Sequence, residues 1–228
     1  YRGPGHYPDA DMLPIGVIDF GRPTKFTPDE HYTLMSLWAI ARSPLIFGGD
    51  MTQLDPFTKE MLTNPSMLKV NQESTNNRQI SRDRDLIVWA ADIPGSPDKY
   101  VALFNARSLG DAAGGTDSAG GATAAGGVAV EAPTVASGTE PAGGGAAAKG
   151  GAVAPATAES GLDPGAAPDA EAPSNGYIVA VDLSAIGIKG PARVTDLWHQ
   201  KDLGIYDKEF SREIPFHGAG LYRVSPVR

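Results

Sequence analysis

The segment that decides the fold is GPGHYPDADMLPIG, residues 3–16. Glycine and proline precede its two carboxylates, Asp9 and Asp11, and a run of mainly apolar residues follows them. In an extended segment, alternation puts Asp9 and Asp11 on one face and Ala10 on the other. The pattern therefore predicts a pair of carboxylates at the end of a strand.

The sequence from Tyr1 to about Gln72 predicts alternating strands and helices. Thr27-Pro28-Asp29-Glu30 has the form of a capping box with proline at the first helical position. The helix that follows carries a broad apolar stripe and ends before Pro44; the stripe contains Leu34, Met35, Leu37, Trp38, Ile40 and Ala41. Leu45–Phe47 has the pattern of a short buried strand, and Asp55-Pro56 begins a second helix. Such βα units are typical of a parallel sheet, but two of them cannot bury both faces of it.

From about Glu73 the chain has the pattern of an antiparallel β-sandwich. Short β-rich runs are separated by Pro, Gly and Asp, as sandwich strands are. The runs are 86–90, 100–104, 177–181, 192–198, 210–215 and 220–224. We therefore expect two regions, 1–72 and 73–228, with the second an antiparallel sandwich.

Residues 109–175 interrupt the sandwich with a Gly/Ala/Pro-rich stretch that lacks aromatic residues. Such a composition buries too little apolar surface to offset its ordering entropy, so the stretch is predicted to be a disordered insertion between two strands. An interdomain linker is the competing interpretation.

The stretch holds eight acidic residues and one lysine, so it carries −7 of the net charge of −8 and leaves −1 for the rest. A nearly neutral remainder indicates no nucleic-acid surface.

Composition excludes several other classes of site and location. The chain contains no cysteine, which excludes disulfides and thiolate sites. No stretch is long and apolar enough to cross a bilayer. Metal-ligand spacing, phosphate-binding glycine loops and nucleophile elbows are absent from the sequence, so no metal or cofactor is expected.

Several segments together resemble the family 27 glycoside hydrolases, the α-galactosidase group. The most specific are Asp9–Leu13, Ser36–Ile40 with Ser43–Leu45, and Val70–Gln72. The resemblance implies that residues 1–72 are the last βα units of a (β/α)8 barrel, lacking roughly its N-terminal two-thirds. It implies that residues 73–228 are the C-terminal sandwich that follows the barrel. A secreted or periplasmic location is expected by the same resemblance.

The resemblance also implies a retaining glycosidase whose catalytic carboxylates lie upstream of Tyr1. Asp9 and Asp11 have a spacing that suits the paired carboxylates of glycoside hydrolysis. However, the family places its nucleophile and its acid/base on earlier strands, and no segment here matches the nucleophile motif. Asp11 and Met12 match the family's Asp-Met at the rim of the active site, and Asp9 lies beside them. We expect these three to contact the sugar; the alternative is that Asp9 and Asp11 bind loop backbone.

Other conspicuous residues have simpler interpretations. Tyr7 and Pro8 replace the family's usual tryptophan and asparagine, and His6 replaces a glycine. The three tryptophans, Trp38, Trp89 and Trp198, are expected to be core residues, although an exposed one can stack on a sugar. Asp50 ends the predicted second strand and is expected either to support the site or to be purely structural. His31, His199 and His217 carry no assigned role.

The sequence therefore predicts a fragment of an α-galactosidase-like enzyme that is inactive by itself. Its expected partner is an α-galactoside oligosaccharide or glycoconjugate, and it is expected to bind neither nucleic acid nor membrane. The alternatives are an α-N-acetylgalactosaminidase or another α-glycosidase of the family, or a non-catalytic carbohydrate-binding sandwich.

Overall fold

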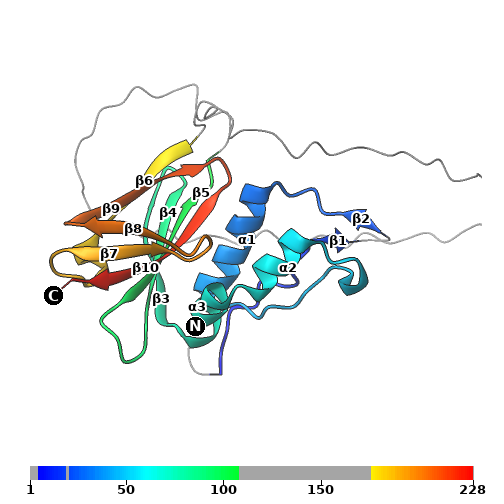
Figure 1. Ribbon diagram of the computed structural model, residues 1–228, viewed down its shortest axis with the longest axis horizontal. Helices are drawn as coiled ribbons and strands as arrows, with labels where there is room; N and C mark the ends of the chain where they lie inside the picture. Colours follow the sequence, from blue (N-terminus) through cyan, green and yellow to red (C-terminus); the bar gives the residue numbers. More distant parts are fainter. Residues whose placement is uncertain (1–4, 19–20, 108–175, 228) are drawn as a thin grey trace, which may run out of the picture. The chain divides into compact units, whose positions relative to one another are not determined.

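The computed structural model describes residues 5–18, 21–107 and 176–227, and Figure 1 shows the arrangement of their elements. The predicted insertion at 109–175 lies outside the described residues. The first part of the chain holds two very short strands, three helices and a 3-10 turn. Their bounds are β1 Val17–Ile18, β2 Arg22–Pro23, α1 Pro28–Ala41, the 3-10 turn Met51–Gln53, α2 Pro56–Thr63 and α3 Pro65–Glu73.

The helix starts follow the sequence signals. The Thr27 hydroxyl accepts from the Glu30 amide and the Glu30 carboxylate accepts from the Thr27 amide, so the predicted capping box of α1 is confirmed. Asp55 caps α2, with Pro56 at the first helical position. The helix α1 ends at Ala41, where Arg42 takes the left-handed conformation.

The predicted parallel strands are reduced to one bridge. Leu13 and Phe47 form an isolated parallel bridge, supported by hydrogen bonds from Leu13 N to Ile46 O (2.7 Å) and from Gly48 N to Leu13 O (3.0 Å). The prediction that Leu45–Phe47 is a buried strand is wrong, because Ile46 is 47% exposed and Leu45 and Phe47 are only half-buried. Two neighbouring strands leave one face of such a pair uncovered.

The second part is an antiparallel sandwich. Its six-stranded sheet has the order β3-β4-β5-β10-β7-β8, and β6 pairs with β9 in a second sheet. The bounds are β3 Thr75–Asp83, β4 Leu86–Asp92, β5 Lys99–Asn105, β6 Gly176–Asp182, β7 Ala192–Asp196, β8 Lys201–Tyr206, β9 Glu209–Pro215 and β10 Ala219–Pro226. All six predicted runs form strands, while β3 and β8 were not predicted.

Strand β5 shows how the six-stranded sheet is buried on both faces. Tyr100, Ala102 and Phe104 belong to the apolar cluster shared with α1 and α3, whereas Val101 and Leu103 belong to the cluster shared with β6 and β9. Alternation along an extended strand produces this division. The helix α1 contacts β5 and β10 on one side and α3 on another (Figure 1). The helical part and the sandwich therefore share one core.

Candidate functional site

The candidate site is the turn that runs from Asp9 to Met12. The Asp9 carboxylate accepts from the Asp11 amide (2.9 Å), and the Asp11 carboxylate accepts from the Met12 amide (2.6 Å). Asp9, Asp11 and Met12 are all exposed, Met12 by 54%. The Asp11 φ is 70°, so the predicted extended alternation of Asp9 and Asp11 is wrong. In the hydrogen bonds among the described residues each carboxylate uses one oxygen, and the other can accept a further hydrogen bond.

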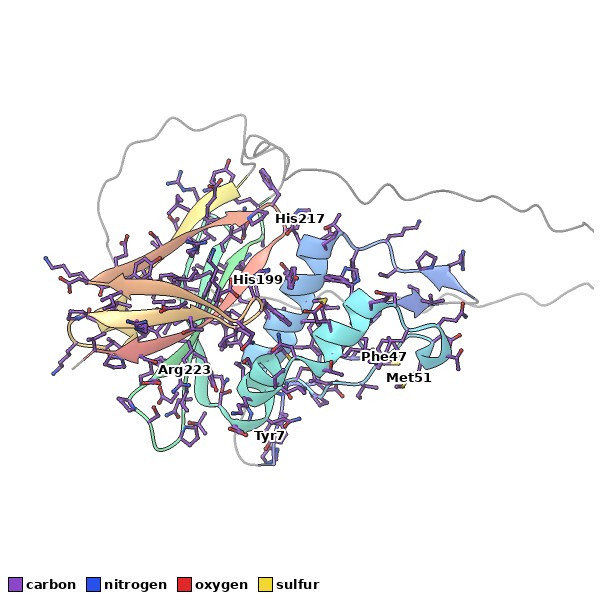
Figure 2. The ribbon with its side chains drawn as sticks, in the orientation of Figure 1. Tyr7, Phe47, Met51, His199, His217 and Arg223 are labelled. Carbon is purple, nitrogen blue, oxygen red and sulfur yellow. The ribbon has the colours of Figure 1, made fainter. Side chains whose placement is uncertain are left out.

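The turn lies at the beginning of the paired segments. Pairing starts at Leu13 and continues to a hydrogen bond from Asp50 N to Val17 O (2.7 Å). Asp11 therefore lies just before the segment that pairs with residues 46–50. Gly49 permits the close approach of the two segments, because an added Cβ would lie 2.4 Å from Ile15 O. The segment with Phe47 and Met51 lies away from the sandwich strands (Figure 2).

Two side chains hold the turn from outside. The Trp38 indole Nε1 donates to Asp11 O (3.2 Å), and the Ser43 hydroxyl accepts from the Ala10 amide (2.9 Å). Sequence reasoning placed Trp38 in the core, but the side chain is only half-buried at the core margin. It did not assign Ser43 a function. Helical periodicity predicts which face of α1 carries Trp38. It does not predict that this face contacts Asp11.

Asp50 serves a local structural purpose. Its carboxylate accepts from the hydroxyl and amide of Thr52 (2.6 and 2.8 Å) and from the side-chain amide of Gln53 (2.8 Å). The hydroxyl of Thr52, followed by the Gln53 amide, lowers the pKa of Asp50 below its ordinary value. The carboxylate thus caps the 3-10 turn, which is a structural role, and support of the site by Asp50 stays a prediction.

A second candidate region is an apolar cavity of about 510 Å³ between α1 and the sheet. Trp38 and Trp89 both line it, and neither is fully buried. The remaining apolar lining consists of Phe26, Leu34, Leu37, Ile87, Phe104 and Ala106. A cavity of this size and polarity suits an apolar side chain or the apolar face of a ligand.

His217 is one of the residues that line the cavity, and it lies beside the first turn of α1 (Figure 2). Its Nδ1 lies 3.1 Å from Glu30 Oε1, and its carbonyl accepts from the Thr33 hydroxyl. The Thr27 amide, followed by the His217 imidazole, lowers the pKa of Glu30. These bonds join the β9–β10 turn to α1.

The other histidines and aromatic residues have structural surroundings. His31 is buried between the rings of Phe26 and Phe57, at centroid distances of 5.8 and 5.5 Å. His199 Nδ1 lies 2.9 Å from Asp196 Oδ2. Trp198 is buried, as predicted. Tyr7 is exposed and its ring lies 5.1 Å from the Arg42 guanidinium carbon; His6 is exposed as well.

In the part of the chain that the structure describes, no three histidine or acidic side chains are grouped so as to hold a metal ion. The helices among those residues are too short or too polar to cross a membrane. The Asp9–Met12 turn offers hydrogen-bond acceptors and an exposed thioether. The carboxylate oxygens suit the recognition of hydroxyl groups, and the thioether side chain suits contact with an apolar surface.

Two family models match this chain. The one described as "Alpha galactosidase A" matches residues 1–73, and the one described as "Alpha galactosidase C-terminal beta sandwich domain" matches residues 173–224. An α-galactosidase of Cyamopsis tetragonoloba is 33% identical over 110 residues, which are 47% of this chain and 25% of the relative. An α-N-acetylgalactosaminidase of Mus musculus is 39% identical over 71 residues, 31% of this chain and 16% of the relative.

Solved structures extend the similarity over nearly all of the chain. A GH27 β-L-arabinopyranosidase from Geobacillus stearothermophilus has a TM-score of 0.66 at 28% identity, covering 99% of this chain and 38% of that one. The chain therefore spans a quarter or less of the two curated relatives and about two-fifths of this solved one.

Proposed function

This chain belongs to the family 27 glycoside hydrolases, and we propose that it forms the C-terminal part of a retaining enzyme that releases terminal α-D-galactosyl residues. The observation that carries the proposal is the exposed Asp9–Met12 turn. Its residue Asp11 is held in a left-handed conformation where the family has its Asp-Met pair. The activity belongs to the full-length protein of which this chain is a part.

In this proposal the residues of the turn bind the sugar and do not cleave it. The free oxygen of the Asp11 carboxylate accepts hydrogen bonds from sugar hydroxyls, and the exposed Met12 side chain packs against the C–H face of the ring. Asp9 is the weaker candidate for contact, because it lies outside the Asp11-Met12 pair that matches the family's Asp-Met.

Bond cleavage requires two further carboxylates. Retaining glycosidases use a nucleophile and an acid/base about 5–5.5 Å apart, with a covalent glycosyl-enzyme intermediate. In our proposal both lie outside this chain, on the amino-terminal side. Binding groups alone do not replace preorganised catalytic groups, so we propose that the isolated chain has no turnover.

Two measurements test the proposal. The purified chain is incubated with an aryl α-D-galactoside, and aryl alcohol released above a heat-killed control would contradict its inactivity. In the full-length protein, Asp11→Ala is expected to lower kcat/KM about 10- to 100-fold, since a hydrogen bond to a charged group is worth roughly 1.5–3 kcal/mol. A kcat/KM within about twofold of wild type would exclude Asp11 from the sugar site.

The main alternative is another activity of the same family. The similarity to α-N-acetylgalactosaminidases favours it, as does the arabinopyranosidase among the solved relatives. Aryl α-N-acetylgalactosaminide and aryl β-L-arabinopyranoside, assayed beside the galactoside with the full-length protein, decide between them by the ratio of kcat/KM values.

A non-catalytic carbohydrate-binding sandwich is the alternative from a different class. Such a function needs exposed aromatic rings on one sandwich face. Tyr100, Trp198, Phe210 and Tyr222 are all less than 9% exposed. Trp89, Tyr177, Tyr206 and Phe216 are half-buried, and no Phe, Tyr or Trp side chain of the described part of the sandwich is exposed. This burial favours a supporting role for the sandwich.

A further inference from the structure

Three sequence segments that are far apart in the chain meet at the candidate site. They are Asp9–Leu13, the end of α1 with Ser43, and Val70–Gln72 in α3. The Asn71 side-chain amide donates to Trp38 O (3.1 Å) and to Ser43 O (2.8 Å). Ser43 N also donates to Trp38 O (2.9 Å). Asn71 thus fixes the backbone of both residues that reach the Asp9–Met12 turn.

The turn needs such support because Asp11 is conformationally strained. Its φ of 70° lies in the left-handed region, which side chains with a Cβ rarely adopt. A residue in a sparsely populated region costs about 1–3 kcal/mol and persists only where its surroundings hold it. Strain of this kind concentrates at functional positions.

The two supporting bonds lie on either side of the strained residue. Ser43 holds the Ala10 amide, one residue before Asp11, and Trp38 holds the Asp11 carbonyl itself. Because the Ala10 amide and the Asp11 carbonyl are both held, the backbone dihedral angles between these two groups, including φ of Asp11, have little freedom. An indole N–H can donate a hydrogen bond but cannot accept one. In this bond Trp38 is therefore the donor and the Asp11 carbonyl oxygen is the acceptor.

We propose that Trp38 and Ser43, held by Asn71, are positioning residues that keep Asp11 in its left-handed conformation and so present its carboxylate and Met12 to the ligand. The consequence for sugar binding rests on the function proposed above; the control of the Asp11 conformation does not. A purely structural role predicts something else: loss of either bond lowers stability and leaves φ of Asp11 unchanged.

The test measures the sign of φ at Asp11 by NMR in the full 228-residue chain. A strong intraresidue NOE between the amide proton and Hα marks positive φ, because these two protons then lie close together. Wild type is expected to show it at Asp11. In Trp38→Phe and in Ser43→Ala the NOE is expected to fall to the intensity of neighbouring residues with negative φ.

Trp198→Phe provides the matched control. It removes the hydrogen bond from the Trp198 indole to Ser36, which lies on α1, the helix that also carries Trp38. Among the described hydrogen bonds, neither Trp198 nor Ser36 bonds to the Asp9–Met12 turn. Trp198→Phe should therefore lower stability and leave the Asp11 NOE strong. A strong NOE in both Trp38→Phe and Ser43→Ala would overturn the proposal, because local bonds of Asp9 and Asp11 would then suffice. Because Ser43→Ala removes only one oxygen atom, it keeps the test decisive if Trp38→Phe does not fold.

The two proposals can fail separately. Loss of the NOE in the variants, combined with an Asp11→Ala enzyme of normal kcat/KM, would leave the positioning correct and the sugar contact wrong. An unchanged NOE with a strongly impaired Asp11→Ala enzyme would give the opposite result.

Discussion

Replacing Trp198 by alanine should test whether the sandwich and the helical part unfold together. The Trp198 ring packs against Tyr32 at a centroid distance of 5.3 Å, and its Nε1 donates to the fully buried Ser36 hydroxyl at 2.9 Å. A buried aromatic side chain covers roughly 150–250 Å², which at about 25 cal/mol per Å² corresponds to about 4–6 kcal/mol. Measured Trp→Ala costs of about 3–5 kcal/mol agree with this range.

The hydrogen bond can be separated from the packing. Trp198→Phe retains an aromatic ring beside Tyr32 and removes the donor to Ser36, so it should cost about 1–2 kcal/mol. Adding Ser36→Ala to Trp198→Phe removes both partners of the bond. The double variant should therefore lose less unfolding free energy than Trp198→Phe and Ser36→Ala lose together as single variants.

Urea unfolding followed by far-UV circular dichroism measures these free energies. We expect one transition for each variant, with the midpoint displaced and the m-value unchanged. If Trp198→Ala lowered the free energy of unfolding by less than about 1 kcal/mol, the loss would be far below the usual cost of truncating a buried aromatic side chain. That result would refute the packing argument. Two separated transitions in wild type would refute the shared core.

Three further predictions concern local features. Thr27→Ala should lower the free energy of unfolding by about 1 kcal/mol through loss of the α1 capping box, with Thr52→Ala in the short 3-10 turn as the milder comparison. Asp11→Val should lower the free energy of unfolding by about 1–3 kcal/mol, whereas Asp11→Gly should change it little, because glycine adopts φ of 70° freely and aspartate adopts it more readily than a β-branched residue does; equal losses in urea unfolding would contradict this. The Thr58 hydroxyl, followed by its amide, lowers the pKa of Asp55 below the ordinary 3.8, so the resulting stability is complete well above pH 3.8 and is lost as the pH falls through the lowered pKa. Asp55→Asn, which keeps a capping side chain, should flatten the acid side of the stability profile, and an unchanged slope would contradict the assignment.

The sequence predicted the four interior strands of the six-stranded sheet and both strands of the second sheet, but it missed the two edge strands of the six-stranded sheet. β3 and β8 are the first and last strands of the six-stranded sheet, and most of their residues are half-buried or exposed. Edge strands carry polar and charged side chains that discourage pairing with other molecules. Their sequences therefore lack the apolar signal by which β4, β5 and β10 were found.

The candidate site was located by motif and misread in conformation. Asp9, Asp11 and Met12 were identified from the Asp-Met resemblance, and all three are exposed in the structure. Alternation was the wrong basis for their geometry, because a left-handed Asp11 breaks the extended segment. The supporting bonds from Trp38 and Ser43 could not be read from local pattern, since they span 27 and 33 residues.

The sequence by itself determined the helix starts, the buried strands and the family motifs, because these depend on capping residues, side-chain period and residue identity within a few positions. Only the tertiary structure decided that α1 packs on β5 and β10, that Asn71 joins the ends of two helices, and that Asp11 adopts positive φ. The physical reason is that these features come from contacts between distant segments. A local dihedral angle that costs free energy is adopted only when such contacts hold it.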